Sequence, residues 1–300
     1  MGNIGCLTGS TILSAIPTSI KVGRFVGVKT TRALTTMSNP SLPAELLDRI
    51  VDFLYDSRSA LKNCCLVSKS WIPRTRVHLF ASVAFYTPES LRSWRRAFPD
   101  PSTSPACYTR LLTIHCPQVV TATDAEEGGW IPTFSRVVNF VVDIRKPDSP
   151  DAPRVSLVPF HGFSPALKSL RVTFTVFPAS RVSNLIHSFT LLEEVSVTTY
   201  DKSDIDDGSS ELPTIVRPSS SPVFTGTLTL WLDMGMDPIA SRLLSLPTGL
   251  QFQELRFLWY HQKDVSLTRA LIERCYSTLE FLCIDCRITG MSARHLRPHW

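Results

Sequence analysis

The chain has 300 residues, of which 43% are hydrophobic and 19% are charged. Its 22 prolines and 13 glycines are too few for collagen or a low-complexity chain, and its length allows a core without metal or disulfide support, which excludes a small disulfide scaffold. The formal net charge is +5, but four cations precede the first acid, Glu45, and the rest of the chain is near neutral. The body therefore lacks the basic stripe that is typical of nucleic-acid binding.

Residues 1–38 contain no acid and are rich in serine and threonine, with four cations between positions 21 and 32. This composition predicts a disordered basic leader, or an extension ahead of a true start at Met37. A mitochondrial transit peptide has the same composition and is the main alternative. A lipid anchor is a third reading, although Cys6 stands where a myristoylation signal has serine or threonine.

Residues 41–83 have the apolar spacing of three short helices. In the first helix the apolar residues recur every three or four positions: Leu42, Leu46, Leu47, Ile50, Phe53 and Leu54. The second repeats Leu61, Cys64, Val67 and Trp71 in the same way, and Pro73 either opens a third helix or kinks the second. About forty residues cannot bury so many large apolar groups among themselves, so the surplus predicts a docking face.

The same segment carries recognisable motifs: Leu-Pro-Ala-Glu-Leu-Leu at 42–47, an apolar set at 50, 53 and 54, and Leu-Val-x-x-x-Trp at 66–71. At this spacing it resembles an F-box of the fungal type, over about 40 of the 300 residues. The resemblance implies a domain that inserts apolar residues into the Skp-type adaptor of a cullin–RING ubiquitin ligase. At or behind that interface it would place Leu42, Pro43, Leu46, Ile50, Leu54, Leu61, Val67 and Trp71. The polar linker at 57–59 departs from the family's pattern and leaves the start of the second helix open.

Beyond residue 105, short alternation of apolar and polar residues predicts seven strands. Their apolar positions are Leu112/Ile114/Cys116, Phe140/Val142/Ile144, Leu170/Val172/Phe174, Val195/Val197/Thr199, Leu228/Leu230/Leu232, Leu255/Phe257/Trp259 and Leu282/Ile284/Cys286. The first of these positions lie 25 to 33 residues apart, and helical patterns at 181–188, 238–246 and 265–277 fill the later gaps. A strand and a helix at this period are typical of a leucine-rich-repeat solenoid.

Four of these units carry a form of the Leu-x-x-Leu-x-Leu core, beginning at Leu167, Leu192, Phe252 and Leu279, without the asparagine that usually follows. The segment 201–221 holds five acids and six serines and predicts a flexible insertion, either solvated or a contact site. The predicted fold class is α+β. It comprises the leader at 1–38, a three-helix F-box at 41–83 and an α/β leucine-rich-repeat-like solenoid at 84–300.

No catalytic or phosphate-binding motif occurs, and no enzyme activity, cofactor or metal is predicted. The pairs Cys283-x2-Cys286 and His295-x3-His299 imitate the ligand order of a zinc finger, but only eight residues separate them, against the usual ~12 or more. The eight cysteines lie in apolar segments, and no apolar run reaches the ~18–20 residues of a membrane span. These features predict a reducing compartment, the cytoplasm or the nucleus, and no membrane span.

The two halves together resemble a fungal F-box protein of the leucine-rich-repeat kind. This implies a non-catalytic substrate-recognition adaptor of a Skp/cullin/F-box ubiquitin ligase, whose repeats bind an unknown protein target. Outward strand positions are the candidates for that contact: Arg171, Thr173, Ser196, Thr198, Arg256 and Asp285. The main alternative is a repeat scaffold or interaction protein that binds no ligase, delivered to mitochondria by the basic leader.

The final alternation, at 281–286, is as apolar as any internal strand, and the residues after it show no amphipathic helix that would cap a repeat. We therefore expect an array that stops in mid-pattern, because of a truncation, because of an error in the gene model, or because a partner supplies the cap. An edge of this kind is expected to self-associate.

Overall fold

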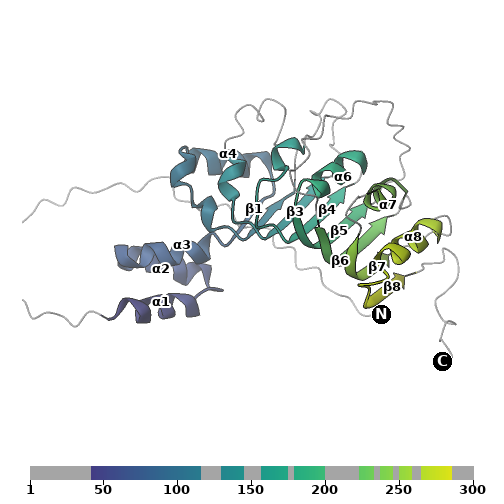
Figure 1. The fold of residues 1–300 in the computed structure, drawn as a ribbon. Helices are drawn as coiled ribbons and strands as arrows, with labels where there is room; N and C mark the ends of the chain where they lie inside the picture. Colours follow the sequence, from purple (N-terminus) through teal and green to yellow (C-terminus); the bar gives the residue numbers. More distant parts are fainter. Residues whose placement is uncertain are drawn as a thin grey trace, which may run out of the picture.

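The computed structural model describes residues 42–115, 130–144, 157–174, 179–199, 223–232, 237–245, 250–258 and 265–285. Short helices lead into one parallel sheet of eight strands (Figure 1). The predicted leader at 1–38 and the predicted insertion at 201–221 lie outside the described residues, as do the last predicted positions of three strands, Cys116, Trp259 and Cys286.

Residues 42–79, called here the helical module, form α1 (Ala44–Phe53), α2 (Arg58–Val67), the one-turn 3-10 helix η1 (Lys69–Trp71) and α3 (Ile72–Leu79). Glu45 lies in the first turn of α1, where the positive end of the helix favours a carboxylate. Pro73 lies in the first turn of α3, where its missing N–H costs nothing. It therefore opens a third helix rather than kinking the second. The open question of the second helix is also answered, since α2 begins at Arg58.

Residues 82–285, called the sheet region, contain β1 (Ser82–Phe85), β2 (Leu111–Ile114), β3 (Asn139–Ile144), β4 (Ser169–Phe174), β5 (Leu191–Thr199), β6 (Val223–Leu232), β7 (Gln251–Leu258) and β8 (Phe281–Asp285). The strands are parallel and pair in strict chain order, each with its predecessor and its successor. Corresponding apolar positions fall into one row across the sheet: Val83, Leu112, Phe140, Leu170, Val195, Leu228, Leu255 and Leu282. The alternation in the sequence thus locates β2 to β8 correctly.

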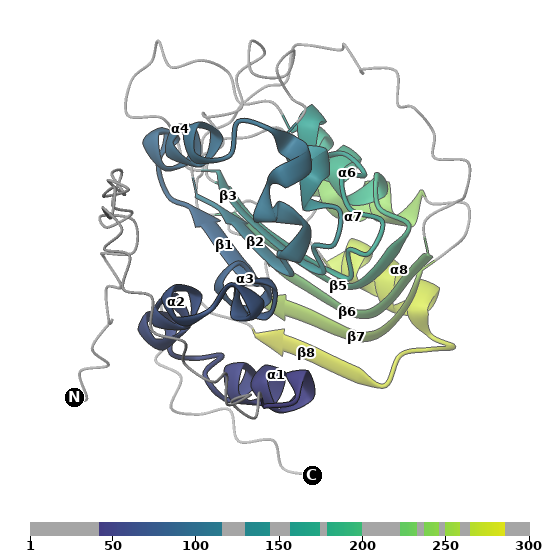
Figure 2. The same cartoon turned by 90° about the vertical axis from the view of Figure 1, so that its left-hand side faces the viewer.

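Within the described ranges, helices cover one face of this sheet (Figures 1 and 2). They are α4 (Pro88–Ala97), α6 (Ala179–His187), α7 (Asp237–Leu244), α8 (Val265–Cys275) and the short 3-10 helices η2 (Pro101–Thr103), η3 (Pro105–Tyr108), η5 (Ile131–Phe134) and η6 (Val158–Phe160). The three helices predicted for the later gaps are confirmed as α6, α7 and α8. Strands have period-two side chains, so one set of positions faces these helices and the other faces away.

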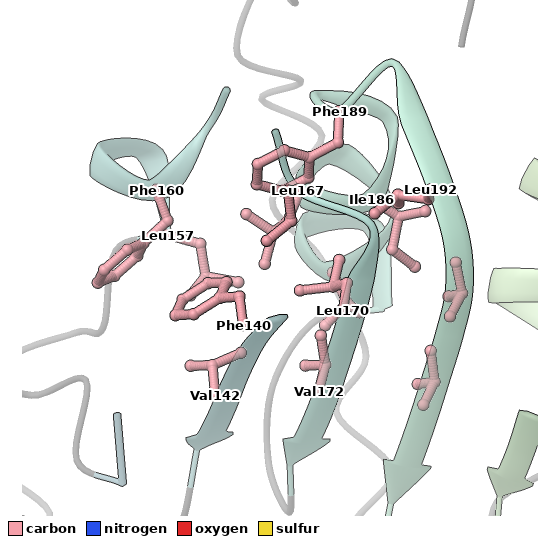
Figure 3. Packing of buried hydrophobic residues seen from close by; sticks show 14 of the residues in the cluster. Phe140, Val142, Leu157, Phe160, Leu167, Leu170, Val172, Ile186, Phe189 and Leu192 are labelled. Carbon is pink, nitrogen blue, oxygen red and sulfur yellow. The ribbon is translucent and has the colours of Figure 1, made fainter. Parts of the chain in front are cut away.

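The hydrophobic core lies between the sheet and its helical cover (Figure 3). Phe140 on β3 packs against Phe160 and Phe163, with ring centroids 5.4 and 5.1 Å away. Further along, the apolar side of α6 enters the same cluster through Val182, Leu185 and Ile186. The core is therefore one continuous layer that every strand from β1 to β7 extends.

A bulge interrupts the pairing of β6 with both of its neighbours. Gly226 lies there with φ of +73°, in the left-handed region that favours glycine. A Cβ at this position would overlap the backbone carbonyl oxygen of Glu193 on β5. The bulge therefore depends on the absence of a side chain.

The sequence analysis predicted no strand before residue 105, and β1 lies across the predicted boundary between 83 and 84. β1 begins at Ser82, pairs with β2 and buries Val83 and Phe85 in the core of the sheet region. The sheet thus begins inside the segment assigned to the F-box, 41–83, and before the predicted solenoid boundary at 84. Only two apolar positions mark this strand, too few for an alternation to be read.

Candidate functional site

The first helix of the helical module is apolar on two sides, and only one of them is buried. Val51 is 1% exposed, and Leu47 and Leu54 are half-buried on the same inner side. On the outer side lie four large apolar residues with exposed fractions of 42% to 84%: Leu42, Leu46, Ile50 and Phe53. Their spacing of four, four and three residues places them on one stripe of the helix. We call these four residues the outer stripe.

The second helix shows the same division. Leu61 is 1% exposed and Cys64 is 6% exposed, whereas Leu66 and Val67 at the end of α2 are 83% and 69% exposed. A side chain buried as completely as Leu61 packs inside the module, so of the two placements expected for it, at or behind the interface, only the one behind fits this burial. Trp71 is half-buried, and Pro43 is exposed beside the outer stripe.

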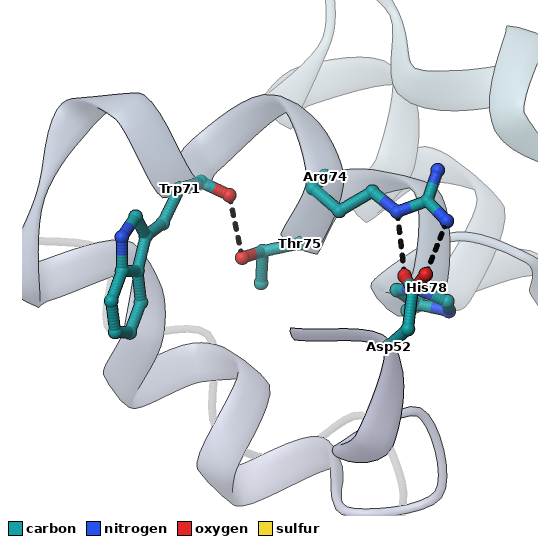
Figure 4. Close-up of polar contacts among 5 residues, drawn as sticks. All are labelled: Asp52, Trp71, Arg74, Thr75 and His78. Atoms are coloured by element: carbon teal, nitrogen blue, oxygen red, sulfur yellow. Dashed lines mark hydrogen bonds and ion pairs between the residues drawn. The ribbon is translucent and has the colours of Figure 1, made fainter. Parts of the chain in front are cut away.

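An ionic cluster fastens α1 to α3 (Figure 4). Arg74 donates two hydrogen bonds of 2.6 Å to the two carboxylate oxygens of Asp52, and His78 Nε2 lies 2.7 Å from Asp52 Oδ1. The hydrogen bonds from Arg74 and then from His78 hold the pKa of Asp52 at about 2, well below its usual range. Thr75, buried within α3, donates a 2.7 Å hydrogen bond to the carbonyl oxygen of Trp71. The cluster fixes α1 with its outer stripe turned away from α3.

The open face of the sheet brings together the residues predicted to contact a target. Arg171, Ser196 and Arg256 lie in one row across β4, β5, β6 and β7, and Thr173, Thr198 and Asp285 lie in the next row. Arg171, Arg256 and Asp285 are exposed, and Thr173 is half-buried. Ser196 and Thr198 lie in these outward rows as predicted, but at 9% and 7% exposure they are nearly buried among the neighbouring strands.

Two sets of interacting side chains on this face were not predicted from the sequence. Glu194 and Glu254 lie in one row: Ser169 Oγ donates across from β4 to Glu194 at 2.6 Å, and Arg256 donates along β7 to Glu254 at 2.8 Å. The bond from Arg256 is the main cause of the lowered pKa of Glu254. Single acids within strands match no sequence motif. Only the strand register shows that Glu194 and Glu254 lie in the same row.

The second missed group lies at the carboxyl ends of β1, β2 and β3. His115 stacks on Tyr86 with ring centroids 4.6 Å apart, and its Nδ1 lies 3.3 Å from Asp143 Oδ2. His115 and Asp143 are 28 residues apart in the sequence, and only the pairing of neighbouring strands brings them together. Asp143 of this group begins the row that continues through Thr173 and Thr198.

Among the described residues there is no group of three or more His, Cys, Asp or Glu side chains that could hold a metal ion. Of the zinc-finger-like set, Cys283 lies half-buried on β8, and Cys286, His295 and His299 lie outside the described residues. No helix in the described ranges is both long enough and apolar enough to cross a membrane.

The last strand has the apolar, exposed character that the sequence predicts for 281–286. Leu282 and Ile284 of β8 are each 41% exposed, in contrast to their buried partners on β7, Leu255 and Phe257, and Phe281 on the other face is 51% exposed. Arg256 of β7 lies over the ring of Phe281, 5.8 Å from its centroid.

Comparison with known proteins identifies no matching family, no similar curated protein and no similar solved structure.

Proposed function

We propose that the chain is a substrate-recognition adaptor of a Skp/cullin/F-box ubiquitin ligase. In this proposal the helical module docks on the Skp-type adaptor, and the open face of the sheet binds the protein that is to be ubiquitinated. The outer stripe is the single observation that carries it.

The outer stripe is better suited to a protein partner than to solvent. Its four residues expose 42% to 84% of their area, with Phe53 the most exposed. Contiguous apolar surface of this kind costs free energy in water and is typical of interaction sites. The motifs at 42–54 and 66–71, which resemble an F-box, fall on the exposed residues of α1 and on the end of α2 and η1.

The target would lie on the open face of the sheet region. Ion pairs already order this face, since Arg256 bonds to Glu254 at 2.7 Å and Arg171 lies 3.8 Å from Glu194. Charges on an exposed, ordered strand face select a partner by complementarity more than they add affinity. Such an adaptor performs no bond chemistry. It raises the effective concentration of a target lysine near the ubiquitin carrier.

The test is a pulldown of the full chain with a purified Skp-type adaptor. The double variant Leu46→Asp/Ile50→Asp replaces two residues of the outer stripe and should abolish capture, because the interface would then bury unpaired charges. The matched control is Val265→Asp on α8, which changes a residue of similar exposure, 50%, in the sheet region and should leave capture unchanged. Undiminished capture by the double variant would overturn the interface assignment.

The same experiment separates this proposal from the alternative of a repeat scaffold without a ligase. The scaffold reading predicts that the wild-type chain captures no adaptor, while the sheet region still binds its partner. A negative result for the wild type, with the chain folded by circular dichroism, would favour the scaffold.

A further inference from the structure

A cavity of about 350 Å³ lies where the helical module meets the sheet region. Its walls come from α2 and the end of α3 on one side, and from β1 and α4 on the other. The docking interface proposed above does not use this cavity, since the outer stripe belongs to α1. Junctions between folding units are common places for small-molecule sites, and a volume of this size is at the lower end of the usual range for such sites.

The inner wall of the cavity is aromatic. Trp94 of α4 contacts Phe80, Phe85 and Phe98 with ring centroids 5.8, 5.8 and 4.8 Å apart. Phe80, Trp94 and Phe98 are half-buried although they pack on one another, and all three line the cavity. This wall favours a flat apolar body, which gains both by burial and by edge-to-face contacts.

Two cations from one side of α2 also line the cavity, Arg58 and Lys62. They are four residues apart and thus lie on one side of the helix, where like charges repel. Arg58 donates one long hydrogen bond, of 3.4 Å, to the carbonyl oxygen of Leu79. Neither cation has a carboxylate partner within the described residues, and the lining contains no Asp or Glu. An anion between these two side chains would relieve their repulsion.

We propose that this cavity binds a small molecule with an aromatic body and an anionic head group, a carboxylate, sulfonate or phosphate. The body lies against the Phe80–Trp94–Phe98 wall, and the head group lies between Arg58 and Lys62 at the cavity wall formed by α2. The wall supplies the affinity and the cation pair supplies the selectivity for an acid.

Two dyes that differ only in charge test both parts of the proposal. The first is 8-anilinonaphthalene-1-sulfonate, and the second is N-phenyl-1-naphthylamine, the same ring system without the sulfonate. Fluorescence titration of the full chain should show saturable binding of both dyes at one site per chain, with the sulfonate bound more tightly. Arg58→Gln/Lys62→Gln should weaken binding of the sulfonate about fivefold to tenfold and leave binding of the neutral dye unchanged.

Two further variants complete the experiment. Lys69→Gln/Arg274→Gln removes the same two charges at exposed positions outside the cavity lining and should leave both affinities as they are. Ala97→Phe, or Ser93→Phe if the first variant does not fold, places a ring in the cavity and should abolish binding of both dyes. Binding that does not saturate, or that survives the added ring, would overturn the site, and an equal effect of the two Gln pairs would overturn the role of the cations. Adaptor capture by Ala97→Phe should persist, so this proposal fails or stands independently of the proposed function.

Discussion

The helical module and the sheet region are built from the same kinds of apolar residue and bury them to very different degrees. Phe140, in the third strand, is 0% exposed, whereas Phe53, at the end of the first helix, is 84% exposed. In the sheet region each strand continues the core of the strand before it, so one face of eight strands is covered by a single layer. In the helical module three short helices enclose only a small core around Val51 and Leu61.

The difference teaches how to read an apolar periodicity. A small unit has a high ratio of surface to volume and cannot bury all of a strongly apolar helix. The same pattern that indicates a core in a repeating sheet therefore indicates a partner in a short helical module. Substituting the same residue type in both regions tests this difference directly.

The largest effect is expected for the matched pair Phe140→Ala and Phe53→Ala. Phe140 lies between Phe160 and Phe163 in the core, and its truncation should destabilise the protein by about 3–5 kcal/mol. Phe53 is exposed, and its truncation should change the free energy of unfolding by less than about 0.5 kcal/mol. Urea denaturation followed by circular dichroism measures both. Equal losses in the two variants would contradict the contrast between the regions.

A smaller loss is expected at the bulge of the sixth strand. Gly226→Ala should cost about 1–3 kcal/mol, because φ is +73° and the new Cβ would meet the Glu193 carbonyl oxygen. Gly162→Ala is the matched control: its φ of +60° carries a similar backbone strain, but the new Cβ would make only an ordinary contact with the Ser188 carbonyl oxygen at 3.5 Å. The difference between the two variants in thermal unfolding isolates the clash from the strain. Equal losses of thermal stability in the two variants would show that the strands move apart enough to accommodate the methyl group.

The sequence predicted the strands of the sheet in more detail than it predicted the outer stripe or the polar groups on the open face. Alternation reports which positions share a face, and that was enough to locate the second to eighth strands and the three helices between the later ones. The helix patterns did not extend to the earlier gaps, where Ile131–Phe134 and Val158–Phe160 form 3-10 turns instead. Prolines at 132 and 159 shorten these segments, and their aromatic residues reach the core without a full helix.

The sites depend on relations that periodicity does not contain. Leu46 and Leu47 are neighbours in one apolar pattern, yet Leu46 is exposed and Leu47 is half-buried, because Leu47 shares the side of the first helix on which Val51 is buried. The stacking of Tyr86 on His115 and the contact of His115 with Asp143 follow from strand register across three strands. Long-range pairing of this kind has no local signal in a single sequence.

The ionic cluster offers a way to loosen the helical module alone. Asp52→Asn removes the carboxylate that Arg74 and His78 share and should cost about 1 kcal/mol or less at neutral pH, because the side chains of Asp52 and Arg74 are 38% and 39% exposed to solvent. The pKa of Asp52 is lowered from 3.8 to about 2, so its contribution is complete above pH 3.8 and is lost as the pH falls toward 2. Hydrogen exchange of the first helix should rise in the variant while exchange in the sheet stays unchanged. Equal exchange changes in both regions would mean that they unfold as one unit.

The smallest effect at neutral pH, and a distinct one in acid, is expected from His187 at the end of α6. Burial, together with the nearby charge of Arg242, lowers the pKa of His187 from 6.5 to about 4, and its buried Nε2 has no hydrogen-bond partner among the residues that the structure describes. Between pH 6.5 and about 4 this histidine is protonated in the unfolded chain but neutral in the folded chain. It therefore lowers the free energy of unfolding as the pH falls through this range. His187→Leu removes both the unpartnered nitrogen and the titration, so it should be near neutral at pH 7.5 and should flatten the fall in stability between pH 6.5 and 4. Asp52→Asn should leave that window unchanged and act only below pH 3.8. Thermal unfolding across this range measures both variants, and a fall that persists unchanged in His187→Leu would place the acid sensitivity of the sheet region on another group.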